Sequence, residues 1–195
     1  MRRREAWTSK FKLARQLTLA VLRFQSTPWV RETLNSKGIH FLESETITQN
    51  HGYSLEDPFI RIQLSQAANN RQLTANSNAY QLSRNEFLFN LGVILLELGY
   101  DAPLRYLRNA EDIRDGDTDA SWYTQFFTAR RLGRSAPREL DARYGRLAKK
   151  CLECDFGVGD DLNSMELQAA IVMDVVNELD RCIKLDGHID SILSV

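Results

Sequence analysis

The feature that most constrains the fold of this chain is a nearly continuous apolar stretch in its middle, SRNEFLFNLGVILLELG, residues 83–99. From residue 87 to residue 98 only an asparagine, a glycine and a glutamate interrupt the large apolar side chains. A helix that is apolar on every side lies inside a core, and this one is too short to cross a membrane, which takes about 20 residues. The stretch therefore predicts a central helix that the rest of the chain surrounds.

Both ends of this predicted helix carry capping signals. Ser83 followed by Glu86 has the spacing of a capping box, and Gly99 suits the position just after a helix. Within the helix, the carboxylate of Glu97 stands among apolar neighbours and is expected to have a hydrogen-bonding or basic partner.

One helix and a small β element are predicted before the central helix. Residues 12–24 place apolar side chains at helical spacing, and Pro28 disfavours helix at the residue before it. Residues 38–44 and 59–65 show the short alternating pattern of strands. The polar, Asn-rich residues 66–82 are expected to form a long loop or a weak helix.

The sequence after the central helix is expected to be helical as well, in segments 102–113, 118–133, 136–153 and 162–185. The expected architecture is mainly α, with a first helix, a small β element and about five further helices around the central one. The length suits a single domain over residues 1–195.

Composition and charge limit where such a chain works. No apolar run approaches the roughly 20 residues of a membrane span, and no apolar segment follows the basic start as in a secretory signal. Three cysteines, an odd and low number, suit a reducing compartment. The net charge of −1 gives no general sign of nucleic-acid binding. We expect a soluble intracellular protein of the cytoplasm, without membrane contact.

The predicted order of elements resembles the C-terminal lobe of a protein kinase, and NLGVILLELG is similar to the central-helix motif of that lobe. Over about residues 15–182 the chain resembles a fungal family of unknown function with a degenerate kinase-like C-terminal lobe. The stretches that carry this resemblance are RQLTLAVLRFQSTPWV, GIHFL, SRNEFLFNLGVILLELGYDAPL, AKKCLECDFG and ELQAAIVMDVVNELDRC. The resemblance implies a kinase C-lobe-like fold without an N-lobe, and a possible missing N-terminal segment.

The tripeptide Asp155-Phe156-Gly157 matches the magnesium-binding signature of kinases, but it follows the central helix by about 60 residues, whereas the kinase signature precedes that helix. Where the resemblance would place the catalytic loop the chain has His40-Phe41-Leu42, with Glu43 and Glu45 as the nearest carboxylates. Residues 62–65, in the place of the metal-binding aspartate, contain no carboxylate. The resemblance therefore implies a pseudokinase-like interaction or scaffold module, which is not an enzyme and holds no cofactor.

Two alternative functions remain open. This lobe could complete a kinase-like enzyme with an N-lobe that lies elsewhere. Alternatively, Cys151, Cys154, Cys182 and His188 have the residue types of a zinc-stabilised structural domain. Against zinc, Cys151 shares an apolar helical stripe with Tyr144, and buried thiols are common core residues.

Charge segregation indicates where a protein partner could bind. Residues 130–150 are strongly basic, whereas residues 153–180 carry eight acids and no base. Neighbouring helices could pair these charges, or a basic face could dock an acidic partner. Nucleic acid is disfavoured, because the basic stretch lacks interleaved base-stacking aromatics; its one aromatic residue, Tyr144, lies on the apolar stripe with Cys151. The candidate partner-binding residues are Arg130, Arg131, Arg134, Arg138, Arg143 and Arg146.

Overall fold

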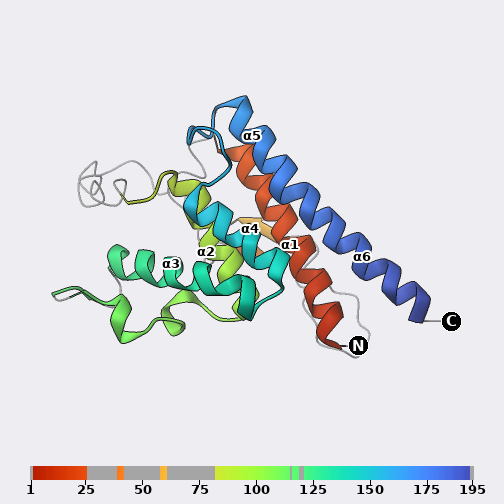
Figure 1. The fold of residues 1–195 in the computed structure, drawn as a ribbon, viewed down its shortest axis with the longest axis horizontal. Helices are drawn as coiled ribbons and strands as arrows, with labels where there is room; N and C mark the ends of the chain where they lie inside the picture. Colours follow the sequence, from red (N-terminus) through yellow and green to blue (C-terminus); the bar gives the residue numbers. More distant parts are fainter. Residues whose placement is uncertain are drawn as a thin grey trace.

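The computed structural model describes residues 2–25, 39–41, 58–60, 82–114, 116–118 and 121–193. The fold is mainly α (Figure 1). None of the described helices is long and apolar enough to cross a membrane. The elements in chain order are α1 (Arg2–Phe24), β1 (Ile39–Phe41), β2 (Pro58–Ile60), α2 (Glu86–Tyr100), η3 (Leu104–Tyr106), η4 (Ala110–Asp112), α3 (Trp122–Glu139), α4 (Ala142–Glu153), α5 (Met165–Ile171), η5 (Val172–Val176) and α6 (Asn177–Leu193).

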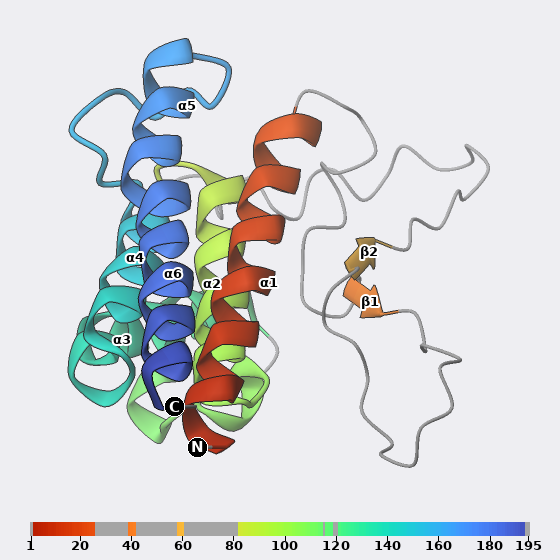
Figure 2. The ribbon, with the colours of Figure 1, turned by 90° about the vertical axis from the view of Figure 1, so that its right-hand side faces the viewer.

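Helix α2 forms the centre of the fold, as its sequence predicts. It packs against α4, α1 and α3, and Figure 2 shows it among α1, α4 and α6. Most of its leucines are almost completely buried, as at Leu88, Leu91 and Leu96. Each Å² of buried apolar area stabilises a fold by about 25 cal/mol. The burial of this helix therefore contributes a large part of the stability of the core. The prediction of a buried central helix is confirmed.

The capping of α2 differs from the prediction at both ends. The N-cap is Asn85, whose side chain accepts a hydrogen bond from the N–H of Leu88, and not Ser83. The chain turns out of the helix at Asp101, in the left-handed region with φ 55°, and not at Gly99. Lys10 of α1 stabilises this end, because its Nζ lies 2.7 Å from Asp101 Oδ2.

The segments before α2 follow the expected order. Helix α1 already begins at Arg2, earlier than the apolar pattern indicates, and packs against α6 and α2. Strands β1 and β2 pair antiparallel, with Ile39 opposite Ile60. The predicted loop or weak helix over residues 66–81, together with Pro28, lies outside the described residues.

The predicted helix over residues 102–113 is wrong. Two short 3₁₀ turns, η3 and η4, replace it. Pro103 before η3 has φ −56° and ψ 142°, and Asn109 before η4 is extended. Both residues interrupt the helical backbone path. The Asp112 side chain instead accepts from the N–H of Asn109, which closes a capping box.

The boundaries of the last helices differ from the predicted ones. Helix α3 passes through the predicted break after residue 133 and ends at Glu139, with Pro137 inside its last turns. Asp141 then caps α4 by accepting from the N–H groups of Arg143 and Tyr144. The predicted segment 162–185 is helical from Met165 onward, through the π-helical turn η5 into α6.

Small residues allow α2, α3 and α4 to pack closely. The side chain of Leu152 on α4 lies where Gly92 of α2 and Gly133 of α3 leave room, since a Cβ at either glycine would come within 2.7 Å of it. A Cβ at Gly145 would lie 2.5 Å from the backbone of Ala136. Helices α3 and α4 therefore run antiparallel, with residue 152 beside residue 133 and residue 145 beside residue 136.

Candidate functional site

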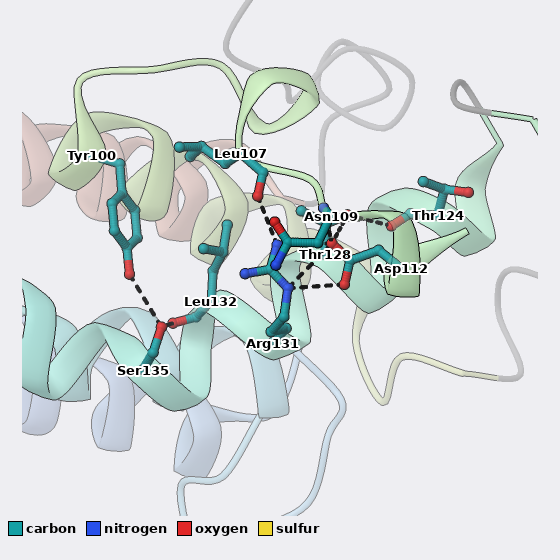
Figure 3. Close-up of polar contacts among 9 residues, drawn as sticks. All are labelled: Tyr100, Leu107, Asn109, Asp112, Thr124, Thr128, Arg131, Leu132 and Ser135. Carbon is teal, nitrogen blue, oxygen red and sulfur yellow. Dashed lines mark hydrogen bonds and ion pairs between the residues drawn. The ribbon is translucent and has the colours of Figure 1, made fainter. Parts of the chain in front are cut away.

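Arg131, one of the six candidate partner contacts, is a structural residue. Its guanidinium binds the Asp112 carboxylate through two nitrogens, with Nε 3.0 Å from Oδ1 and Nη2 2.8 Å from Oδ2 (Figure 3). Nη2 also donates to the backbone oxygen of Leu107 at 2.7 Å. Asp112 is only 4% exposed. The donors of Arg131 therefore tie η3 and η4 to α3, and its contact with a partner stays a prediction.

The carboxylate of Asp112 also accepts hydrogen bonds from two other groups. The N–H of Asn109 donates to Oδ2 at 2.8 Å, and the Thr128 hydroxyl lies 3.2 Å from the same atom and 2.8 Å from the backbone oxygen of Thr124. Burial acts to raise the pKa of Asp112, but the hydrogen bonds and charge of Arg131 and the Asn109 N–H outweigh it and hold the pKa below its usual value. Asp112 is thus kept ionised inside the fold.

The side of α3 near Tyr100 carries a second local network. The Tyr100 hydroxyl lies 3.4 Å from the Ser135 hydroxyl, which in turn donates to the backbone oxygen of Leu132 (Figure 3). The Tyr100 hydroxyl also donates to Glu139 Oε2 at 2.6 Å. Burial, together with the hydrogen bond to Glu139, raises the pKa of Tyr100 to about 12. The carboxylate of Glu139 is therefore engaged by Tyr100.

Charges on α4 are paired with the helix that follows. Lys150 forms an ion pair with Asp174 of η5, and Arg143 lies 3.8 Å from Glu178 of α6. Lys149 lies 3.9 Å from Glu153, one turn along α4. For this part of the basic stretch, the structure supports charge pairing between neighbouring helices. Arg143 is thus already held by a carboxylate.

The arginines of α3 other than Arg131 are in a different situation. Arg130, Arg134 and Arg138 follow one another at intervals of four residues and are exposed. Residues at this spacing share one face of a helix, so we call these three the arginine stripe. Among the described residues, no carboxylate pairs with the stripe or with exposed Arg146 of α4.

A cleft of about 430 Å³ lies beside the N-terminal end of the arginine stripe. Apolar side chains from α2, α3 and α4 and charged side chains from the same region line it. We call it the aromatic cleft, because Phe89 and Phe126 stack within it with ring centroids 5.4 Å apart. Its lining residues are Leu82, Arg84, Phe89, Phe126, Arg130, Gly133, Lys149, Leu152, Glu153 and Asp155.

A second cleft, of about 370 Å³, lies on the other side of α4. Met173 of η5 lines it and is 62% exposed. Its charged lining includes the two ion pairs that join α4 to η5 and α6, together with Arg146 and Arg181. Lys149, Glu153 and Asp155 line both clefts, so the C-terminal end of α4 forms the ridge between them.

The tripeptide at residues 155–157 belongs to the turn that ends α4. Cys154 adopts a left-handed conformation, and the N–H of Asp155 donates to the backbone oxygen of Lys150. Phe156 is buried in the core, whereas Asp155 is exposed. Gly157 has φ 72°, a conformation that favours glycine. The structure thus explains each of the three residues by its part in ending the helix.

The three cysteines are free and buried. Burial and the neighbouring Cys154 raise the pKa of the Cys151 thiol to about 12, and burial raises the pKa of Cys154 and Cys182. No group of three potential metal ligands forms within the described part of the chain. The side chain of His188 lies outside the described residues. The expected common stripe of Cys151 with Tyr144 is confirmed, because both are fully buried in the core.

Other residues singled out in the sequence have mixed outcomes. Glu97 Oε1 accepts from the N–H of Leu104 at 2.7 Å, which confirms the expected partner, while Oε2 is buried without a partner in the described structure. Phe87 packs against the core. Glu43, Glu45 and residues 62–65 lie outside the described residues.

Comparison with known proteins identifies one family for most of the chain. Neither curated proteins nor solved structures give a match. A family model matches residues 2–185, which include every residue of both clefts and of the arginine stripe. The chain belongs to DUF7580, a family described as a domain of unknown function.

Proposed function

We propose that this chain is a non-catalytic protein-interaction module whose contact surface is the arginine stripe of α3. The observation that carries the proposal is that the stripe is exposed and lacks carboxylate partners. Arg143 and Lys150 on α4 have carboxylate partners, whereas the three stripe arginines have none among the described residues. A row of exposed guanidinium groups attracts and orients a partner of opposite charge.

The module is proposed to be related to the C-terminal lobe of protein kinases, as a pseudokinase without phosphoryl-transfer activity. Two features support this relationship. The described elements follow the order of a first helix, a β pair, a buried central helix and peripheral helices. The tripeptide at residues 155–157 comes after the central helix and ends α4, so it does not stand where the kinase metal site would be.

The proposed partner is an acidic protein segment. A guanidinium can bind a carboxylate through two parallel hydrogen bonds, and spaced arginines favour a chain that repeats carboxylates. Single-stranded nucleic acid would also need aromatic side chains on which bases stack. The residues between Arg130 and Arg138 include no aromatic residue. Charge alone would also draw DNA or anionic lipid, so the test includes both.

The experiment measures fluorescence anisotropy of a labelled glutamate-rich peptide as the protein is added. The test variant is Arg130→Glu/Arg134→Glu/Arg138→Glu. The matched control, Arg23→Glu/Arg105→Glu/Lys184→Glu, makes the same change in net charge at exposed residues outside the stripe. We expect the test variant to raise the Kd at least tenfold and the control to change it less than threefold, since contact charges act mainly at short range.

Equal losses in both variants would contradict the proposal, because only net charge would then matter. The same anisotropy assay with a labelled DNA duplex, and sedimentation with phosphatidylserine vesicles, give the other arms. Tighter stripe-dependent binding to either than to the peptide would also contradict an acidic protein partner.

A further inference from the structure

We infer that the aromatic cleft receives one aromatic anchor residue of the partner, and that the partner then runs as an extended peptide along the arginine stripe with Asp or Glu at alternate positions. This inference rests on the proposed function, and it adds the anchor, the spacing and the direction of the bound segment.

The interior of the cleft suits an aromatic side chain. Phe89 and Phe126 are 3% and 6% exposed, and Trp122 stacks on Phe126 with centroids 5.2 Å apart. Leu152 and Gly133 also lie at this apolar floor, and charged side chains form the rest of the lining. The volume of about 430 Å³ lies within the range of roughly 300–1,000 Å³ typical of ligand sites. Aromatic anchors in apolar pockets beside arginines are frequent binding hot spots.

The rim of the cleft favours the same kind of residue. The guanidinium of Arg130 lies 6.0 Å from the ring centroid of Phe126, so it stands over an aromatic face at the cleft's edge. An incoming ring can contact this planar cation in the same way. Arg84 and Lys149 add two more cations to the rim. Arg130 belongs to both the cleft and the arginine stripe, which makes the two surfaces continuous.

The spacing of the stripe selects an extended peptide. Four residues of an α-helix rise about 6 Å, so successive stripe arginines are about that far apart. Two residues of an extended chain span about 6.6 Å, and their side chains point the same way. Carboxylates at every second position would therefore meet Arg134 and Arg138 in turn. The geometry predicts a segment with one aromatic anchor and acids at the second and fourth positions from it, on one side of the anchor.

The acids of the rim set the direction. Glu153 and Asp155 stand at the C-terminal end of α4. Since α4 is antiparallel to α3, with residue 152 beside residue 133 and residue 145 beside residue 136, the stripe leads away from these two carboxylates. Carboxylates of the partner are thus repelled on one side of the anchor and attracted on the other. The bound segment should be acidic on one side of its aromatic residue only.

The test begins with a random 12-residue peptide display library, selected on the wild-type protein and counter-selected on the triple Arg→Glu stripe variant. The expected peptides contain one aromatic residue with Asp or Glu at the second and fourth positions from it, all on the same side. Each selected peptide is then measured by anisotropy beside a version in which the aromatic residue is alanine. We expect the alanine version to bind roughly tenfold more weakly or worse, as loss of a buried aromatic side chain requires.

Amide chemical shifts locate the anchor. The aromatic peptide should shift the amides of Leu82, Gly133 and Glu153, and the alanine version should shift only those along the stripe. Acidic peptides selected without an aromatic residue, or equal binding of the two versions, would overturn the cleft inference and leave the proposed function standing. Selected peptides without acidic enrichment, or no selected peptides at all, would also overturn the inference. If the glutamate-rich peptide also failed to bind, the proposed function would be contradicted as well.

Discussion

The close approach of α3 and α4 holds the stripe beside the cleft, and Gly145→Ala tests it directly. The added Cβ would lie 2.5 Å from three backbone atoms, the carbonyl carbon and oxygen of Ala136 and the nitrogen of Pro137. Backbone cannot rotate away as a side chain does, so the overpacking cost should fall near the upper end of the usual range of about 1–3 kcal/mol. Alanine recovers about 1 kcal/mol through its better helix propensity.

The expected net loss in the free energy of unfolding is therefore about 2 kcal/mol. For a chain of this size, that lowers the Tm by roughly 4–8 °C. Urea denaturation followed by circular dichroism gives the free energy, and a thermal melt gives the Tm. The slope of the urea transition should not change, because the fold stays the same.

Gly133→Ala is the matched comparison within the same helix pair. Its Cβ would meet only Cδ1 of Leu152, at 2.7 Å, which is the far end of a flexible side chain. The strain should nearly cancel the gain in helix propensity, so we expect a change within about 1 kcal/mol. Gly159→Ala, with no atom within 4 Å of the new Cβ, is the control. A Gly145→Ala protein as stable as the Gly133→Ala protein would refute the account of close packing.

Four further predictions follow from the same contacts. Arg131→Ala should cost about 1–3 kcal/mol because it leaves buried Asp112 unpaired, whereas Arg134→Ala should stay within about 0.5 kcal/mol; urea denaturation of the two variants compares them. Folding lowers the pKa of Asp112, so its ionised carboxylate stabilises the folded state at pH values above the unfolded-state pKa of about 4. This stabilisation is lost as the pH falls through the folded-state pKa. Asp112→Asn should therefore flatten the acid limb of a stability-against-pH curve, and an unchanged limb would exclude Asp112 as its source. The thiol of Cys151, with a pKa of about 12, should react with a disulfide reagent at pH near ~8 only after unfolding in urea, and fast labelling of native protein would contradict its burial. Mg²⁺·ATP should leave the Tm unchanged, and a magnesium-dependent rise would favour the kinase-like enzyme instead.

The central helix could be predicted because its signal is intrinsic to the sequence. Apolar residues on every side of α2 can be satisfied only inside a core, whatever the neighbours are. The same holds for Cys151 and Tyr144, which share a stripe of α4. By contrast, the choice of Asn85 over Ser83 as N-cap depends on tertiary contact. The amide nitrogen of Asn85 donates to the backbone oxygen of Asp160, in the loop between α4 and α5.

The arginines show what the sequence reveals about a site and what it does not. Arg130, Arg134 and Arg138 are four residues apart and share a face, which the sequence already indicates. Arg131 is offset by one residue and must point elsewhere, so the spacing could have separated it from the stripe. Its partner, Asp112, could not be identified from the sequence, because it lies in a segment where helix was expected and a 3₁₀ turn formed. The aromatic cleft joins residues of three helices, and no local pattern reveals it.

Binding of a partner along one face of α3 can be located by backbone amide shifts of the isotope-labelled protein, recorded as the unlabelled glutamate-rich peptide is added. We expect the largest shifts on residues 130–138, with little change along α1. The largest shifts on α1, or on the cleft between α4 and α6, would contradict a contact surface on α3.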